Sequence, residues 1–107
     1  MTAELRGQPI DLKMKIAFVE TQALQLEFIQ PLSDDNLFRE FLRERGGGLH
    51  HIMFNMPEPL AIAEQLGVSI LQKGQSITPG LSWYYLDTEK ELGMPLELRE
   101  TPRQPQD

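Results

Sequence analysis

Three side chains that could bind a metal or transfer protons each lie in a separate apolar stretch of the sequence. Glu27 and Glu97 have apolar neighbours on both sides, and His51 lies in a segment of strand-like composition. If the three strands share a curved sheet, one imidazole and two carboxylates converge on one divalent cation. Such nitrogen and oxygen donors suit Zn, Co, Ni, Mn or Fe(II). Taken singly, each glutamate is more simply a solvated residue on the outer face of a sheet, because its apolar neighbours mark the core face.

Two adjacent histidines, His50 and His51, fall in the strand expected over residues 49–56. Neighbouring residues of a strand point to opposite sides, so this pattern predicts that only one of the two rings faces the site. The simpler alternative is that both are ordinary histidines of a sheet. The absence of cysteine excludes thiolate metal sites and a cysteine nucleophile. The glycines at 46–48 lead into a strand rather than a helix, which argues against a phosphate-binding loop.

The elements that position these residues follow from hydrophobic periodicity and turn residues. Alternating patterns predict strands over residues 12–18 and 24–29, which we expect to form a hairpin. Helix start signals at residues 33–35 predict a first helix that ends at the three glycines. The remaining expected elements are strands at 2–5, 49–56, 68–71, 82–86 and 95–100, a helix at 60–66 and a charged turn at 87–93.

Composition sets the broad class of the protein. A chain of 107 residues with 40% hydrophobic side chains is one domain with a real core. Its net charge of −6 disfavours a dedicated nucleic-acid binder, because phosphate backbones are repelled. The longest apolar runs are far too short to cross a membrane. We therefore expect a cytoplasmic protein that binds neither nucleic acid nor membrane.

Two stretches of this sequence resemble the vicinal oxygen chelate superfamily (glyoxalase, bleomycin-resistance and dioxygenase proteins), in its methylmalonyl-CoA epimerase-like or glyoxalase-like branch. One is residues 24–54, with a strand ending in Gln-Pro-Leu, a helix rich in Phe and Leu, glycines and then Leu-His-His-Ile; the other is residues 85–98. The resemblance implies an α+β fold in which paired β-α-β-β-β modules form a half-open mixed-sheet barrel around a metal. It places the metal ligands of this chain at Glu27, His51 and Glu97.

The chain departs from that family at its start, because the first strand, the first helix and one histidine ligand have no counterpart. We expect one incomplete two-module domain over residues 1–100. Residues 1–32 are the remnant of the first module, 33–48 are a connecting helix with a glycine joint, 49–100 are the second module, and 101–107 are a loose tail. The strand edges left open predict a homodimer, with exchange of modules between chains as one arrangement. A fragment of a longer protein or a shortened gene would equally explain this start.

Three classes of function remain open from the sequence. The first is a metal-dependent lyase or isomerase acting on a small carbonyl or thioester substrate through an enolate, with Glu27 and Glu97 as catalytic residues. The second is a non-catalytic, small-molecule-binding dimer of the drug-resistance type. The third is a degenerate paralogue without a metal. A ring-cleaving dioxygenase is disfavoured, since its iron site needs two histidines and one carboxylate.

Overall fold

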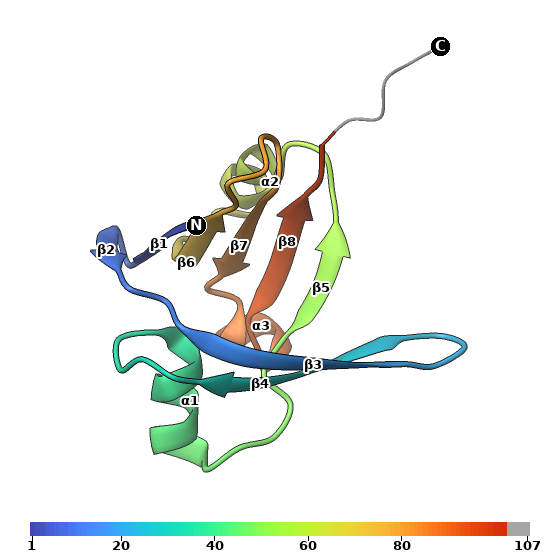
Figure 1. The fold of residues 1–107 in the computed structure, drawn as a ribbon. Coiled ribbons are helices and arrows are strands. Elements are labelled where there is room, and N and C mark those ends of the chain that lie inside the picture. Colours follow the sequence, from blue (N-terminus) through green and yellow to red (C-terminus); the bar gives the residue numbers. More distant parts are fainter. Residues whose placement is uncertain (103–107) are drawn as a thin grey trace.

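The computed structural model describes residues 1–102, so the expected tail at 101–107 lies largely outside the described part of the chain. Figure 1 shows the elements in chain order. The strands are β1 (Thr2–Leu5), β2 (Gln8–Ile10), β3 (Met14–Glu20), β4 (Gln25–Pro31), β5 (Ile52–Asn55), β6 (Ile70–Gln75), β7 (Ser82–Leu86) and β8 (Leu96–Glu100). The helices are α1 (Leu37–Arg45), α2 (Pro59–Leu66) and α3 (Glu89–Leu92). The predicted α+β class is confirmed.

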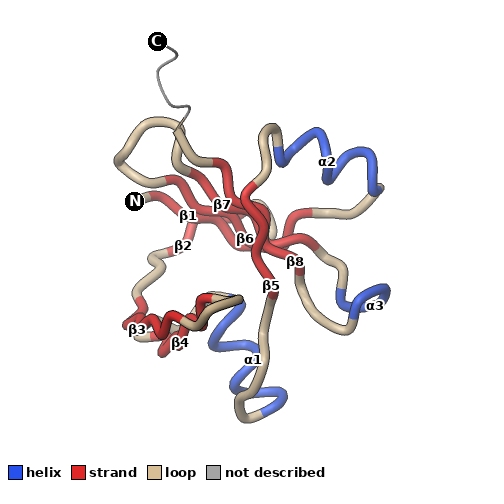
Figure 2. The backbone as a smooth tube through the Cα atoms, turned by 90° about the vertical axis from the view of Figure 1, so that its right-hand side faces the viewer, coloured by secondary structure: helices blue, strands red, loops and turns tan. Residues whose placement is uncertain are grey.

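Six strands form one mixed sheet in the order β2-β1-β6-β7-β8-β5. The β5–β8 pair is parallel, whereas β6, β7 and β8 are joined as an antiparallel meander. Helix α2 covers one face of this sheet, where Ala63 packs with the fully buried Leu86 and Leu98. Helix α1 lies on the other side, as Figure 2 shows, where Phe38 packs with Tyr85 and residues from β1.

The strands β3 and β4 form a separate two-stranded hairpin, which runs across one end of the main sheet in Figure 1. Their predicted pairing as a hairpin is confirmed, with Phe18 opposite Glu27 and Ala17 opposite Phe28. Most of the hairpin is exposed on both faces, and Phe28 keeps 58% of its surface accessible. Among the described residues, β4 pairs only with β3.

Two buried polar residues fix the start of helix α1, and one of them ties it to the sheet. The side chain of Asn36 caps the helix by accepting a hydrogen bond from the Arg39 N–H at 2.9 Å. The side-chain oxygen of Gln72, on β6, accepts from the Leu37 N–H at 2.9 Å. The helix ends at Gly46, whose φ of 75° is the left-handed conformation that glycine adopts without strain. These contacts fix Phe38 between the sheet and the two histidines.

Three local expectations need correction. The strand predicted at 49–56 begins only at Ile52, so both histidines lie in the loop before β5. The charged turn after β7 contains the short helix α3. In β4 the leucine face is not the core face, because Leu26 is exposed and Glu27 points inward. None of the helices within residues 1–102 has the length and apolar character to cross a membrane.

Candidate functional site

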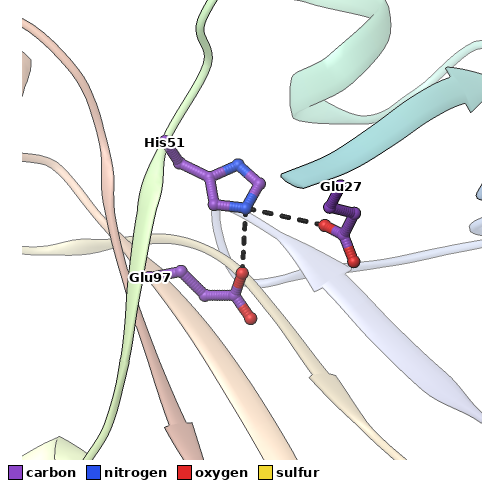
Figure 3. Close-up of side chains that lie close together, drawn as sticks. All are labelled: Glu27, His51 and Glu97. Atoms are coloured by element: carbon purple, nitrogen blue, oxygen red, sulfur yellow. Dashed lines mark ion pairs between the residues drawn. The ribbon is translucent and has the colours of Figure 1, made fainter. Parts of the chain in front are cut away.

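The structure brings together the three side chains that the sequence singled out (Figure 3). His51 Nε2 lies 3.0 Å from Glu97 Oε1 and 3.8 Å from Glu27 Oε1. One ligand atom from each residue falls within 4.8 Å of the others. Glu27 comes from β4, Glu97 from β8, and His51 from the loop that leads into β5. Their roles as metal ligands or catalytic groups stay predictions.

Strand register places Glu97 on the covered face of the sheet. It lies opposite Tyr85 on β7 and Met53 on β5, and Tyr85 in turn lies opposite Gln72 on β6. Residues directly opposite one another share a face, so this row faces α1 and the hairpin. The alternation that sends Leu98 to the α2 side therefore sends Glu97 beneath His51. The reading of Glu97 as a solvated residue is wrong, since only 1% of its surface is exposed.

The two carboxylates share a poorly solvated space. Burial raises the pKa of Glu27, and the nearby charge of Glu97 raises it further, while His51 acts in the opposite direction. Burial also raises the pKa of Tyr85 well above its usual range, with the charges of Glu97 and Glu27 adding to this effect. Tyr85 therefore stays protonated at neutral pH and remains a hydrogen-bond donor in the wall of the site.

A divalent cation fits this donor set. Ligand atoms about 2.1 Å from one ion lie roughly 3.0–3.4 Å apart, so the His51–Glu97 spacing needs no change and the Glu27 spacing needs a small side-chain shift. Burial is the main cause of the raised pKa of Glu27, and the like charge of Glu97 adds to it. A dication would neutralise both charges. The three residues thus form a possible metal-binding triad of one nitrogen and two oxygen donors.

A positive group also borders the triad. Arg99 lies two residues beyond Glu97 on β8, and its Nη2 is 3.5 Å from Glu97 Oε2. Its Nε is buried and has no hydrogen-bond partner among the described residues. The arginine charge lowers the pKa of Glu27 as the weakest of its four influences. Sequence reasoning missed this residue, although its i+2 spacing from Glu97 on one strand put it on the same face.

The two histidines do not point to opposite sides, which corrects the expectation from strand alternation. They precede β5, and their Nδ1 atoms lie 2.9 Å apart. The His50 ring packs edge-on against Phe38 and Phe41, with centroid distances of 5.2 and 5.0 Å. Burial, and then the neighbouring His51, lower the pKa of His50 to about 4, so this ring is neutral at pH 7. The two rings therefore contact each other in one cluster, in which His51 reaches the glutamates and His50 packs against the phenylalanines.

No family model matches the chain. A curated relative, an uncharacterized Bacillus subtilis protein called YqjC, is 43% identical over 42 residues, which are 39% of this chain. That match spans only 30% of the relative's length.

Several solved structures share the fold of this chain. A hypothetical protein from Bacillus halodurans C-125 has a TM-score of 0.65 at 24% identity, over 88% of this chain and 71% of that one. Methylmalonyl-CoA epimerase from Mycobacterium tuberculosis has a TM-score of 0.63 at 17% identity, over 94% and 73%. A methylmalonyl-CoA epimerase solved with methylmalonyl-CoA and NH4+ gives 0.58 at 20%, over 92% and 81%. The chain therefore has the methylmalonyl-CoA epimerase and glyoxalase fold.

Proposed function

We propose that this chain is an epimerase-like, metal-dependent enzyme that moves a proton beside the carbonyl of a small thioester or carbonyl substrate. The observation that carries the proposal is the convergence of Glu27, His51 and Glu97 from three separate segments of the fold. The likeness to methylmalonyl-CoA epimerases in fold supports the reaction class, and at 17–20% identity it goes no further. Zn, Co, Ni, Mn and Fe(II) all remain compatible with the donor set.

His51, Glu97 and Glu27 would hold the cation, with His51 giving Nε2 and each glutamate one oxygen. A bound dication would supply Lewis-acid polarisation of the substrate carbonyl. Glu27 would accept the proton from the adjacent carbon, and the electron pair of the broken C–H bond would move into the enolate. Its side chain is 19% exposed, so the oxygen that does not hold the cation can reach a substrate.

Epimerisation also needs a proton delivered to the opposite face of the enolate. Glu97 faces the same nitrogen of His51, Nε2, as Glu27 does, and it comes from a strand of the main sheet. Because only 1% of its surface is exposed, we assign Glu97 the role of holding and charge-balancing the cation; water would deliver the second proton, and Glu27 would return the first one to solvent. Tyr85, held protonated beneath the two rings, orients the carboxyl groups rather than reacting, because only 4% of its surface is exposed.

The test measures exchange of the substrate α-proton in D2O together with metal content. Purified protein is loaded with Zn(II) or Co(II), and propionyl- or methylmalonyl-CoA is followed by proton NMR. Glu27→Gln should abolish exchange. Glu20→Gln, which changes an exposed glutamate of the same hairpin, should leave exchange intact. Absence of metal binding, or exchange that survives Glu27→Gln, would refute the proposal.

The exposed hairpin favours a second candidate, a small-molecule-binding dimer of the drug-resistance type. Apolar side chains cover both faces of β3 and β4, and such patches commonly mark protein or ligand contacts. We propose a second copy of the chain as the partner that covers them. A binder would retain its ligand in the presence of a chelator, whereas the enzyme would lose all activity.

A further inference from the structure

The contact between the two histidine rings restricts where their protons lie. His50 Nδ1 and His51 Nδ1 are 2.9 Å apart, which is a hydrogen-bond distance. A neutral imidazole carries one N–H and one lone pair, so one Nδ1 must donate and the other accept. The tautomers of the two rings are therefore linked: a proton on one Nδ1 requires a lone pair on the other.

The second nitrogen of His51 belongs to the triad. His51 Nε2 lies 3.0 Å from Glu97 Oε1, and a carboxylate oxygen can only accept a hydrogen bond. Without a cation, Nε2 therefore carries the proton and Nδ1 accepts from His50. To bind a cation, Nε2 must present its lone pair, so the proton of His51 moves to Nδ1 and His50 must become the acceptor.

The surroundings of His50 make His51 its hydrogen-bond partner. Its ring lies edge-on to Phe38 and Phe41, and the Tyr85 ring is 6.3 Å away between centroids. Aromatic carbons offer no strong acceptor or donor in the plane of the imidazole. Within the described residues, the hydrogen bond recorded for the His50 side chain is the one to His51.

We propose that His50 is a positioning residue, which fixes the ring orientation of His51 and switches its tautomer when a cation binds. The rings of Phe38 and Phe41 pack against His50 and fix its position. The hydrogen bond from His50 to Nδ1 of His51 then directs Nε2 of His51 toward Glu27 and Glu97. The change of tautomer on cation binding rests on the proposed metal site. The hydrogen bond between the two rings, and the link it makes between their tautomers, apply to the metal-free protein as well.

Two substitutions of the same size separate hydrogen bonding from packing. His50→Asn keeps a donor and an acceptor one bond beyond Cγ, where Nδ1 stands, whereas His50→Leu puts methyl groups there. Zn(II) affinity is measured by calorimetry, and histidine tautomers are read from two-bond 1H–15N spectra. Substituting a residue that hydrogen-bonds to a histidine ligand lowers metal affinity by about 10–100-fold. We expect a loss of that size in His50→Leu and affinity within about threefold of the parent in His50→Asn.

Leu60→Asn is the control, because it makes a leucine-to-asparagine change at an exposed position of α2 that contacts neither histidine ring. It should bind Zn(II) with unchanged affinity and keep the parent's tautomers. The inference fails if His50→Leu binds Zn(II) as tightly as the parent, or if His50→Asn is as weak as His50→Leu. If the parent protein binds no metal, the proposed function fails, and metal-free spectra still decide this inference. An Nδ1 15N shift of His51 that is the same in the metal-free parent and in metal-free His50→Leu would overturn it, because that nitrogen loses its hydrogen-bond donor in the variant.

Discussion

The strands β4 and β8 carry the same short pattern and differ in almost everything that surrounds them. Glu27 lies between Leu26 and Phe28, as Glu97 lies between two leucines. Each glutamate is opposite an aromatic residue of the preceding strand, Phe18 in one case and Tyr85 in the other. Yet Tyr85 is 4% exposed and Phe18 is 53% exposed.

The difference comes from neighbours rather than from the strands themselves. β8 is paired on both edges, by β7 and β5, and α2 packs against its leucine face. Within the described residues β4 is paired on one edge only, and nothing there covers its leucine face. The same pattern thus gives a rigid half of the site at Glu97 and an open half at Glu27. Experiments that treat the two strands identically should give unequal results.

The largest inequality is expected for the residue after each glutamate. Leu98→Ala should lower the free energy of unfolding by about 2–5 kcal/mol, because it opens a cavity beneath α2. Phe28→Ala should cost less than about 0.5 kcal/mol in the monomer, since its ring is mostly in water. Urea unfolding at low protein concentration measures both. Equal losses would show that the hairpin is as well packed as the sheet.

The next inequality concerns metal affinity. Glu97→Gln should weaken Zn(II) binding by at least about 100-fold, because the oxygen it removes is already oriented by a buried, paired strand. Glu27→Gln should weaken it by about 10-fold, because part of its binding energy is spent on ordering a more exposed side chain. Calorimetric titration of the three proteins compares them directly. A larger effect at Glu27 would reverse the assignment of rigid and open halves.

The sequence predicted more of the sheet than of the hairpin for the same physical reason. Alternation in β8 identifies Leu98 as core and Glu97 as its opposite face, and this is what the structure shows. In β4 the same rule fails, because the apolar face of Leu26 and Phe28 lacks the covering layer that the rule assumes. Convergence of the three site residues was inferred from residue type and from resemblance, since ligands spread over a sheet have no fixed spacing.

The contact between the histidines could not be predicted from the strand pattern. Alternation separates neighbouring side chains only inside a strand, and His50 and His51 lie before β5. Their loop conformation follows from the glycine-rich connection after α1 and from the packing of Phe38, which is a tertiary effect. Tyr85 could be placed beside Glu97 only once the register of β7 and β8 was known, whereas the i+2 spacing of Arg99 from Glu97 was a signal in the sequence itself.

A smaller effect is expected for association of two chains. The outer face of the hairpin includes Leu26, Phe28 and Val19, which lie on one side of the pair. If a second copy covers this face, Leu26→Lys should convert a dimer to a monomer, as judged by native mass spectrometry. Leu60→Lys, an exposed leucine on α2, is the control and should leave the dimer intact. A parent protein that stays monomeric at high concentration would contradict the dimer.

The smallest expected effect is on the pH dependence of stability in the metal-free protein. Burial and Glu97 raise the folded pKa of Glu27, so between its unfolded value near 4.5 and the higher folded value the folded chain binds more protons than the unfolded one. Stability contributed by this group is therefore lost as pH rises through that window. In EDTA, Glu27→Gln should melt at a higher temperature than the parent at pH 7.5, and the two should melt together below pH 4. Saturating Zn(II) should reverse the order at pH 7.5, because the cation stabilises the parent more than the variant. If the variant melts below the parent in EDTA at pH 7.5, the attraction of the Glu27 carboxylate to His51 outweighs its burial and its repulsion from Glu97. The Glu27 side of the site would then be more ordered than the exposure of β4 indicates.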